Sequence, residues 1–581
     1  MPGMQHLAGS AGVLALGLAA AVALAAVPED LPEAEKAIAD TVDPWGLPFS
    51  DQLERFRGRF ADAPDADYCL GVTHDLVKIW PNKYWFRGPS FPSAAQPEPG
   101  RADLLWAAAG TTQAFQVAVL PRVGAPADTY EVAVEVGELS GLASAEVYRE
   151  VFVTTAEPAY PRYNTDRWPD PLVPGRTADI AEGLEGAPFW VDVHLPAGMP
   201  SGRIECRVNV TNGRQRCRVS VPIQVVAGLA LDPKAYPFVG WFQRKWGGGT
   251  LSEDQFRGLC ELVLAHHLLP LDALRGTWKP DDPGAFDDLH AFLAERGQRL
   301  FDIGPANAKD FETLYAHVKQ AGWLDRAIVY SNADEPDDAT FVEKNIPFCR
   351  MVHEKYPGLA VYLASEWHEN MEQGCDLWMT DVSASRYDPG RHRDLQAPTL
   401  WHYYCHLPVR WQMRAPLAMA PNMQIDNEAI EHRIALWMSR YYGAKAVFIW
   451  AGFCANDLKA DFWDTLALSD QPSAFPYAGI HNGNNFRVYP PREENGPVLP
   501  SLRLKVTRAA LEDLALLKAA EQLLASGKVA GDRAARLREL LDPVPGLFVD
   551  MHYFTRDPER LLDRREEILR VLGAALGQPA E

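Results

Sequence analysis

Residues 327–336 read Ala327-Ile328-Val329-Tyr330-Ser331-Asn332-Ala333-Asp334-Glu335-Pro336, an apolar run that gives way to a polar stretch with two adjacent acids. The apolar part is typical of a buried strand. Pro336 restricts the preceding residue and removes a backbone donor, so we predict that the strand ends here with Glu335 extended and both acids in a stiff turn. Neighbouring carboxylates repel, which favours one protonated and one ionised group. Because Asp-Glu-Pro is also common in solvated turns, the tripeptide alone does not establish a catalytic site.

This stretch belongs to a longer alternation of apolar strands and amphipathic helices that begins after Tyr236. We expect strands at residues 237–242, 268–273, 299–303, 327–333, 360–364, 376–380, 399–404 and 446–451. Helical patterns separate several of them, at residues 252–266, 285–296, 310–320, 339–356 and 428–442. Such alternation implies parallel strands with crossover helices. Eight units predict a (β/α)8 TIM barrel over residues 236–530, closed by a helix at 501–526, with C-terminal helices in 531–581.

The sequence before the barrel has a different rhythm. Residues 68–235 contain short alternating strands, such as 114–119, 130–135, 189–193 and 219–223, separated by turn residues. This pattern predicts an all-β sandwich. Residues 28–67 are acidic and rich in proline, and they are expected to form a linker or a loosely docked extension with one short helix. The predicted fold class is therefore α/β plus all-β, with an N-terminal β-sandwich before the barrel.

An uncharged apolar stretch, Leu7 to Val27, precedes these domains. Its length and its Ala23-Leu24-Ala25 end are typical of a secretory signal, so we predict that residues 1–27 direct export to the periplasm or the medium. The segment before it, Met1 to His6, has no Lys or Arg, and an uncleaved N-terminal anchor therefore stays open as an alternative.

Charge and motifs exclude several classes of function. The net charge of -21 disfavours nucleic acid and anionic membrane surfaces, because phosphate binding needs clusters of Lys and Arg. We expect no membrane binding beyond the N-terminal anchor. Phosphate-binding glycine loops, His-Glu-x-x-His helices and nucleophile elbows do not occur, so no cofactor is predicted. No metal is predicted either, since His402 and His406 lie in an expected strand that would carry them apart. The oligomeric state is not indicated.

The eight cysteines form no Cys-x-x-Cys pair. Cys206 and Cys217 flank Asn212-Gly213, a strong signal for a two-residue hairpin turn. In that register Cys206 faces Val219, and a disulfide to Cys217 would need a slipped pairing. The sequence leaves this bridge open.

In a barrel of this kind the active site lies at the carboxyl ends of the strands. The residues expected there combine carboxylates, amides and aromatic rings: Trp241, Gln243, Arg244, Asp334, Glu335, Glu366, Trp367, Asp381, Tyr403, Tyr404, His406, Trp450, Asn456 and Asp457. Rings that stack on sugar faces and polar groups that bind hydroxyls are typical of a carbohydrate site. Any one of these aromatic residues is more often part of a core, but their shared placement at strand ends favours a glycan or glycoconjugate substrate.

A glycosidase needs an acid near the leaving oxygen and a second group that activates water or attacks the sugar. The expected seventh strand, Trp401-His402-Tyr403-Tyr404-Cys405-His406, offers no carboxylate as that second group. A 2-acetamido sugar would resolve the difficulty, because its own carbonyl oxygen can attack while Asp334 orients the amide and Glu335 acts as acid and base. Two alternatives stay open: a glycosidase that pairs Glu335 with Asp381 or Glu366, and a non-catalytic carbohydrate-binding barrel.

Several short stretches stand out by their order and spacing: Trp168-Pro169-Asp170-Pro171-Leu172-Val173-Pro174, Phe189-Trp190-Val191-Asp192-Val193, Pro200-Ser201-Gly202, Asp334-Glu335-Pro336, Trp401-His402-Tyr403, Pro421-Asn422, Ile425-Asp426, Arg433 with Trp437, Ile449-Trp450, Ser501-Leu502-Arg503 and Leu511-Glu512-Asp513. Together they resemble the glycoside hydrolase family 123 catalytic-domain superfamily, which includes the domains of unknown function numbered 4091. The sequence departs from the family pattern at Asn482-Gly483-Asn484, where relatives often have Gly-Asp-Gly.

The resemblance implies a retaining exo-β-N-acetylgalactosaminidase or hexosaminidase that acts through an oxazoline intermediate. By position, Asp334 would steer the acetamido group, and Glu335 would protonate the leaving oxygen and later activate water. Contacts to the sugar are expected, from placement at strand ends more than from the motifs, from Trp241, Asp381, Tyr403, Tyr404, Asn422 and Trp450.

Overall fold

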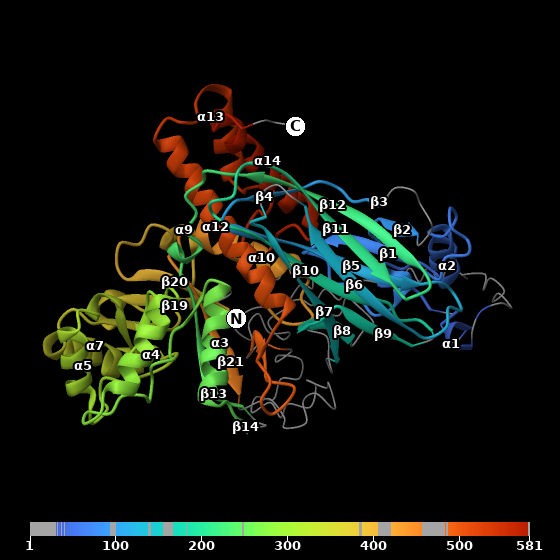
Figure 1. Cartoon of the computed structure of the whole chain (residues 1–581). Helices are drawn as coiled ribbons and strands as arrows, with labels where there is room; N and C mark the ends of the chain where they lie inside the picture. Colours follow the sequence, from blue (N-terminus) through green and yellow to red (C-terminus); the bar gives the residue numbers. More distant parts are fainter. Residues whose placement is uncertain are drawn as a thin grey trace, which may run out of the picture.

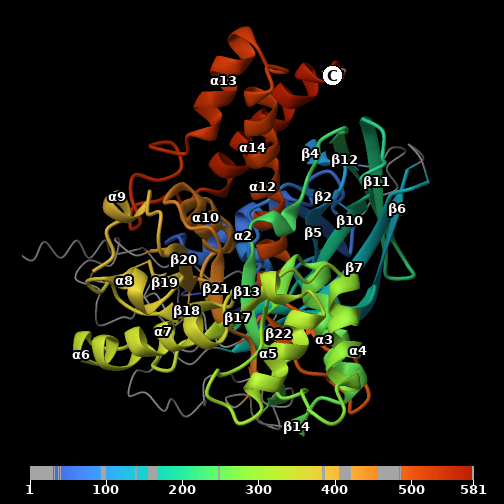
Figure 2. The same ribbon diagram turned by 90° about the vertical axis from the view of Figure 1, so that its left-hand side faces the viewer.

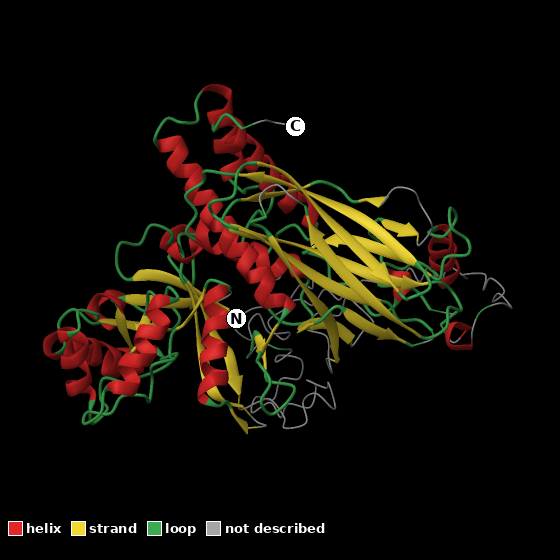
Figure 3. Ribbon diagram, in the orientation of Figure 1, coloured by secondary structure: helices red, strands yellow, loops and turns green. Residues whose placement is uncertain are grey.

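A computed structural model of the chain is shown in Figure 1. It describes residues 31, 33–36, 38–39, 41–92, 100–137, 141–154, 167–181, 183–246, 249–382, 386–404, 420–455, 483 and 486–578. A half dominated by long strands lies beside a half in which helices surround a second set of strands (Figure 3). The fold is therefore of the mixed α/β plus all-β class.

The strand-dominated half is a sandwich of two six-stranded sheets. The first sheet has the order β2-β1-β5-β10-β7-β8, with β1 (Tyr68–His74), β2 (Ser90–Pro92), β5 (Thr111–Pro121), β7 (Ser144–Thr154), β8 (Arg167–Pro174) and β10 (Ala187–Leu195). The second has β3 (Gly100–Arg101), β12 (Arg216–Val226), β11 (Gly202–Thr211), β6 (Asp128–Val136) and β9 (Thr177–Ile180) in that order, with β4 (Leu105–Ala108) also paired to β12. Alternate apolar residues of both sheets, among them Val117, Val191, Val208 and Val221, form the core between them.

The acidic segment before the sandwich is packed rather than loosely docked. Short α1 (Glu33–Lys36) is followed by α2 (Phe49–Gly58), whose Phe49, Leu53 and Phe56 recur at helical spacing and are buried. Phe49 and Phe56 pack edge-on against Tyr84 of the turn η1 (Lys83–Trp85), with ring centroids 5.2 and 4.8 Å apart. This burial of aromatic area explains why α2 stays on the sandwich.

The β11–β12 hairpin corrects the register that the sequence suggested. Cys206 pairs with Val221 and Cys217 with Val210, so the prediction that Cys206 faces Val219 was wrong. The turn is longer than Asn-Gly alone because Asn212 Oδ1 accepts hydrogen bonds from Arg214 N (3.1 Å) and Gln215 N (2.8 Å). Both cysteines are buried and free, and no disulfide joins them.

All eight strands expected after Tyr236 lie in one curled parallel sheet. Its order is β15-β13-β21-β20-β19-β18-β17-β16, and β14 (Gly249–Thr250) forms a short hairpin with β13. The strands are β13 (Phe238–Trp246), β15 (Leu268–Pro270), β16 (Phe301–Asp302), β17 (Ala327–Tyr330), β18 (Ala360–Ala364), β19 (Leu377–Asp381), β20 (Thr399–Tyr404) and β21 (Val447–Ala455). Between β15 and β16 the described residues form no ladder, although Asp302 N donates to Leu271 O at 2.8 Å. The sheet is thus a curled half-barrel, and its full closure is not confirmed.

Helices connect these strands close to the expected positions (Figure 2). They are α3 (Glu253–Ala265), α4 (Gly284–Glu295), α5 (Phe311–Gln320), α8 (Met371–Gly374), α9 (Pro389–His392) and α10 (Ala429–Tyr441), with 3-10 turns η2 (Pro233–Ala235) and η3 (Leu324–Arg326). The helix expected at 339–356 is divided into α6 (Asp338–Thr340), the π-helical turn η4 (Phe341–Asn345) and α7 (Ile346–Lys355). The start of α3 is fixed by a capping box between Ser252 and Gln255.

Helix α12 (Leu502–Ala525) joins the two halves. Arg503 pairs with Asp170 of β8 at 2.9 Å, and Lys505 and Arg508 pair with Asp192 of β10 at 2.6 and 2.7 Å, all of them buried. Buried pairs of this kind add little net stability, but removing one partner leaves an uncompensated buried charge and is strongly destabilising. The chain ends with β22 (Val488–Tyr489) and β23 (Leu499–Pro500) before α12, and with α13 (Gly531–Leu541) and α14 (Pro558–Ala575) after it.

None of the helices in the described part of the chain is both long and apolar enough to cross a bilayer. Residues 1–27, where a signal or anchor is expected, lie outside the described residues, so that segment stays a prediction.

Candidate active site

The turn that carries the two acids leaves β17 but stays attached to β18. Ser331 N donates to Tyr362 O, and Glu335 N donates to Ala364 O, both at 3.0 Å. Glu335 has φ +41°, in the left-handed region, so the prediction that Pro336 keeps it extended was wrong. A left-handed residue other than glycine costs roughly 1–2 kcal/mol and persists where its surroundings fix it. Here the bond to Ala364 fixes it, and it aims the Glu335 side chain.

Asn345 braces the same turn from the π-helical segment η4. Its Nδ2 donates to Ser331 Oγ at 2.7 Å and to Ala333 O at 2.9 Å, and the side chain is fully buried. Asn345 is the last residue of this π-helical turn, and π-helical turns of this kind are frequent at functional sites. The turn is therefore held from β18 on one side and from η4 on the other.

Both acids are exposed at the carboxyl edge of the sheet, and each accepts a hydrogen bond from a tyrosine. Tyr330 Oη donates to Asp334 Oδ1, and Tyr403 Oη donates to Glu335 Oε1 at 2.7 Å. Burial and the nearby Asp334 carboxylate raise the pKa of Tyr330, so its hydroxyl stays protonated and acts as the donor. The structure thus brings Asp334, Glu335 and Tyr403 together, as the sequence predicted from their strand ends.

Aromatic side chains line the inner face of the curled sheet beneath these acids. Trp241 packs edge-on against Tyr330 and Phe448, with ring centroids 5.8 and 5.7 Å apart. Tyr362 lies 4.7 Å from Tyr330 and 6.4 Å from Trp401, measured between ring centroids. Trp241 is therefore next to the tyrosine that holds Asp334, in agreement with its expected place at the site.

A buried polar cluster in the same interior was missed by the sequence analysis. Asp302 accepts hydrogen bonds from Gly304 N (2.6 Å), from Arg275 and from Tyr362 Oη. The Arg275 guanidinium also lies 5.1 Å from the centre of the Trp241 ring. Asp302 is the last residue of β16, so its position at a strand end was the available signal. Tyr362 lies within β18, where the sequence gives no sign of which residues face inward.

Tyr404 is placed away from the site, in contrast to the expected sugar contact. Its hydroxyl donates to Ala435 O at 3.0 Å and lies 3.0 Å from Ser439 Oγ, both on α10. His402 faces the same helix, with its Nδ1 3.0 Å from Ser439 Oγ, and burial lowers its pKa to about 3. Side chains alternate along β20, so Tyr403 faces inward and Tyr404 packs in the core.

The other expected sugar contacts, Asp381, Trp450 and Asn422, lie in three different parts of the barrel half. Asp381 ends β19, is buried, and pairs in register with Tyr403 at the carboxyl edge. Trp450 is half-buried in β21 against the hydrophobic core. Asn422 is buried before α10, where its Oδ1 accepts from Met423 N at 2.7 Å and its carbonyl oxygen lies 3.1 Å from His432 Nδ1. His406, Asn456 and Asp457 lie outside the described residues.

Glu366, one of the alternative partners for Glu335, is held at the rim. Its Oε2 accepts from Arg386 N at 3.0 Å, and Arg386 also donates to both oxygens of Asp338 at 2.6 and 3.1 Å. His368 Nδ1 lies 2.6 Å from Asp338 Oδ1. The hydrogen bonds from Arg386 and then His368 lower the pKa of Asp338 to about 2. Arg386 thus links Glu366 to Asp338 at the rim.

Two groups of described residues have metal-ligating atoms close together. One is Cys349, His353 and Asp376, with His353 Nε2 3.0 Å from Asp376 Oδ2. The other is Glu146, Asp192 and His194, in which Asp192 is already paired with Lys505 and Arg508. Neither of these two groups includes Asp334 or Glu335.

The chain shares its fold with a solved family 123 glycoside hydrolase from Clostridium perfringens, described for glycolipid glycan hydrolysis. The TM-score is 0.60 at 11% sequence identity, and the match covers 87% of this chain and 98% of that one. The resemblance carried by the sequence motifs is thus confirmed at the level of the fold.

Other similarities are weak. A GH10 xylanase with a bacterial Ig-like domain, from termite gut, matches with TM-score 0.24 at 9% identity over 72% of this chain and all of that one. β-Glucuronidase 3 of Bacteroides uniformis matches with TM-score 0.22 at 9% identity over 59% of this chain and 46% of that one. No protein-family model and no curated protein matches the sequence.

Proposed function

We propose that the protein is a glycoside hydrolase in which Glu335 is the general acid and base. The observation that carries this proposal is the exposed Glu335 carboxylate at the carboxyl edge of the sheet, oriented by the 2.7 Å hydrogen bond from Tyr403. A positioned carboxyl group is what protonation of a leaving glycosidic oxygen requires. The family 123 fold supports the same reaction class by analogy.

We further propose substrate assistance by a 2-acetamido group, as in a retaining exo-β-N-acetylgalactosaminidase or hexosaminidase. Glu335 gives its proton to the leaving oxygen while the acetamido carbonyl oxygen attacks C1, so the glycosidic bond breaks and an oxazoline forms. Asp334 accepts the amide N–H and stabilises the positive charge. Glu335 then removes a proton from water, whose oxygen opens the oxazoline at C1 with net retention. Tyr330, bonded to one Asp334 oxygen, fixes the other as the amide acceptor.

The sugar would lie over the inner aromatic face, with Trp241, Tyr403, Asp381, Asn422 and Trp450 as contacts. We propose that β15 and β16 complete a closed (β/α)8 barrel around this face. β15 and β16 stand at the two ends of the strand order, and the hydrogen bond from Asp302 N of β16 to Leu271 O, just after β15, supports that closure. Tyr404 is not among the proposed sugar contacts, because its hydroxyl donates a hydrogen bond to Ala435 O of α10. Export of the protein to an extracytoplasmic glycan is part of the same proposal.

The test is hydrolysis of aryl β-GalNAc, β-GlcNAc and β-galactoside substrates. Substrate assistance predicts turnover of the acetamido sugars and at least about a hundredfold slower turnover of the galactoside. Comparable rates on the galactoside would refute it and favour an unassisted glycosidase using Asp381, which also lies at the carboxyl edge. If the protein binds these sugars but hydrolyses none of them, the alternative of a non-catalytic carbohydrate-binding barrel is favoured.

pH–rate profiles assign the two roles. Glu335→Gln should remove the basic limb and Asp334→Asn the acidic limb, with kcat lowered roughly 10²- to 10⁴-fold in each. Asp337→Asn is the matched control, since Asp337 is also exposed and caps α6 through Thr340 N at 2.7 Å. Asparagine caps helices as well as aspartate does, so this variant should keep the parent profile. Unaltered profiles in both site variants would overturn the assignment.

A further inference from the structure

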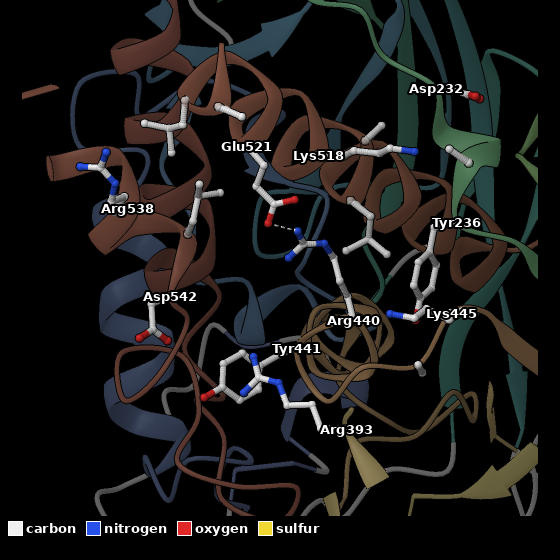
Figure 4. A pocket seen from close by; sticks show the side chains of 17 residues that line it. Asp232, Tyr236, Arg393, Arg440, Tyr441, Lys445, Lys518, Glu521, Arg538 and Asp542 are labelled. Atoms are coloured by element: carbon white, nitrogen blue, oxygen red, sulfur yellow. Dashed lines mark hydrogen bonds and ion pairs between the residues drawn. The ribbon is translucent and has the colours of Figure 1, made fainter. Parts of the chain in front are cut away.

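A cavity of about 1160 Å³ opens at the amino edge of the curled sheet, away from Glu335. Its walls come from the segment before β13, from the residues that precede β20 and β21, from the end of α10, and from α12 and α13 (Figure 4). The starts of three parallel strands meet here, whereas Asp334, Glu335 and Tyr403 follow strand ends. One strand length, roughly 17–20 Å, therefore separates this cavity from the candidate active site.

The cavity is basic although the chain carries a net charge of -21. Five cationic side chains line it: Arg393, Arg440, Lys445, Lys518 and Arg538. Among the residues that the structure describes, three acidic side chains do so: Asp232, Glu521 and Asp542. The wall thus has a surplus of two positive charges, and like charges held around one space favour an anionic occupant.

Part of the acidic charge is already used by ion pairs. Glu521 pairs with Arg440, as Figure 4 shows, and Asp232 pairs at 2.8 Å with Arg299, which is not part of the wall. Arg393 is held by the Tyr441 ring, 4.5 Å from its centroid. Within the described part of the chain, the side chains of Lys445, Lys518 and Arg538 make no hydrogen bond or ion pair, and all three are exposed to the cavity or to solvent. Lys518 lies near the Asp232 carboxylate without forming an ion pair with it, and the charges of all three side chains are open to a ligand.

Helix dipoles explain only some of these cations. Arg440 and Arg538 lie in the last turns of α10 and α13, where a positive charge is favourable. Lys445 lies in the loop before β21, and Lys518 lies about two turns before the end of α12. Neither of these lysines serves a helix terminus, so their convergence on the cavity needs another reason.

We propose that this cavity binds a small polyanion with at least two oxyanion groups, such as sulfate, phosphate or carboxylate groups. Lys445, Lys518 and Arg538 would contact the oxyanions, and the preoriented Arg393 and Arg440 would line the entry. Tyr236, Tyr441 and leucines of α12 provide apolar surface for the body of the ligand, as in most small-molecule sites. An acidic saccharide fits this combination of rings and cations. The proposal does not depend on the proposed hydrolytic function.

Calorimetric titration of the full chain at fixed ionic strength tests the site. Pyrophosphate, a disulfated disaccharide and a dimer of a uronic acid represent the three sources of oxyanions, and acetate is the monoanion control. We expect saturable binding of at least one dianionic probe with one site per chain. The double variant Lys445→Gln/Lys518→Gln should weaken it by at least about tenfold. Lys279→Gln/Lys309→Gln removes the same charge from exposed positions outside the wall and should leave the affinity within about threefold.

Absence of saturable binding of all three probes would overturn the proposal, as would equal weakening in both double variants, which indicates diffuse electrostatic attraction only. If the cavity variant does not fold, Arg538→Gln alone, at the exposed end of α13, should still weaken binding roughly three- to tenfold. Glycoside turnover should be unchanged in the cavity variants, and anion binding should be unchanged in Glu335→Gln. The two proposals can therefore fail separately.

Discussion

The Tyr403 hydroxyl donates a 2.7 Å hydrogen bond to Glu335 Oε1 although the two residues are 68 positions apart. Strands β18 and β19 lie between β17 and β20 in the sheet, so a flat sheet would keep the two side chains well apart. The curl of the sheet turns both carboxyl ends toward the same space. This contact orients the proposed acid through a neutral donor.

Replacing Tyr403 with Phe removes that hydroxyl and keeps the ring. We expect kcat on an aryl β-GalNAc substrate to fall about tenfold, because Glu335 loses a hydrogen bond to a charged group. The free energy of unfolding should change by less than about 1 kcal/mol, since Glu335 is exposed to water. Steady-state kinetics and urea unfolding measure the two effects. An unchanged kcat would remove Tyr403 from the mechanism.

Tyr404→Phe is the matched control for that experiment. Its hydroxyl bonds to Ala435 O in the core, so the loss should destabilise the protein by roughly 1 kcal/mol and leave kcat at the parent value.

Asn345→Ala should loosen the turn that carries both acids. The variant loses the bonds to Ser331 Oγ and Ala333 O, and Glu335 is no longer held in its left-handed conformation from both sides. We expect kcat to fall at least about tenfold with KM changed little, because small misplacement of a catalytic group is costly. Tyr315→Phe loses a 2.9 Å bond to Pro357 O far from the acids and serves as the control for stability alone. Equal kcat in the two variants would show that Asn345 acts only on folding.

His402 should make stability depend on pH. Burial lowers its pKa from 6.5 to about 3, so between these values the unfolded chain binds a proton that the native protein does not. The contribution of neutral His402 to the free energy of unfolding is fully present above pH 6.5. It is lost as the pH falls toward 3, by up to about 1.4 kcal/mol per pH unit. Urea unfolding at pH 7, 6 and 5 should show a shallower decline for His402→Gln than for the parent. Parallel declines would contradict the prediction.

Cys206 and Cys217 should both be free thiols in the oxidised protein, because their strand register places each opposite a valine. Alkylation in denaturant without reductant, followed by mass spectrometry, should label both residues. Because the pair forms no disulfide, adding a reductant should not lower the midpoint of thermal unfolding by breaking a bond between these two residues. Recovery of a linked peptide containing residues 206 and 217 would contradict the structure.

The prediction of the elements was accurate where local patterns decide them. All eight parallel strands and the helices α3, α4, α5, α10 and α12 lie within a few residues of their expected bounds, and α13 and α14 lie in the expected C-terminal segment, since apolar periodicity is a property of each segment alone. The division of the helix at 339–356 was not predictable in this way. The π-helical turn is stabilised by Asn345 reaching Ser331, a contact between separate elements.

The same distinction applies to the candidate site. The alternation of side chains along β20 predicts that Tyr403 and Tyr404 face opposite sides of the sheet, but it does not indicate which of the two faces the interior of the curled sheet. Packing of α10 decides this, because Ser439 and Ala435 accept Tyr404 and leave Tyr403 to Glu335.

The sequence by itself determined the order of strands and helices, the place of Asp334 and Glu335 at a strand end, and the aromatic character of the neighbouring strand ends. These features depend on residue type and spacing within short segments. Only the tertiary structure decided that Glu335 is left-handed, that Tyr403 rather than Tyr404 reaches it, that Asp302 and Arg275 lie beneath the site, and that basic residues from five separate segments surround one cavity. Each of these depends on which faces meet when the sheet curls and α12 docks, and no local pattern specifies that.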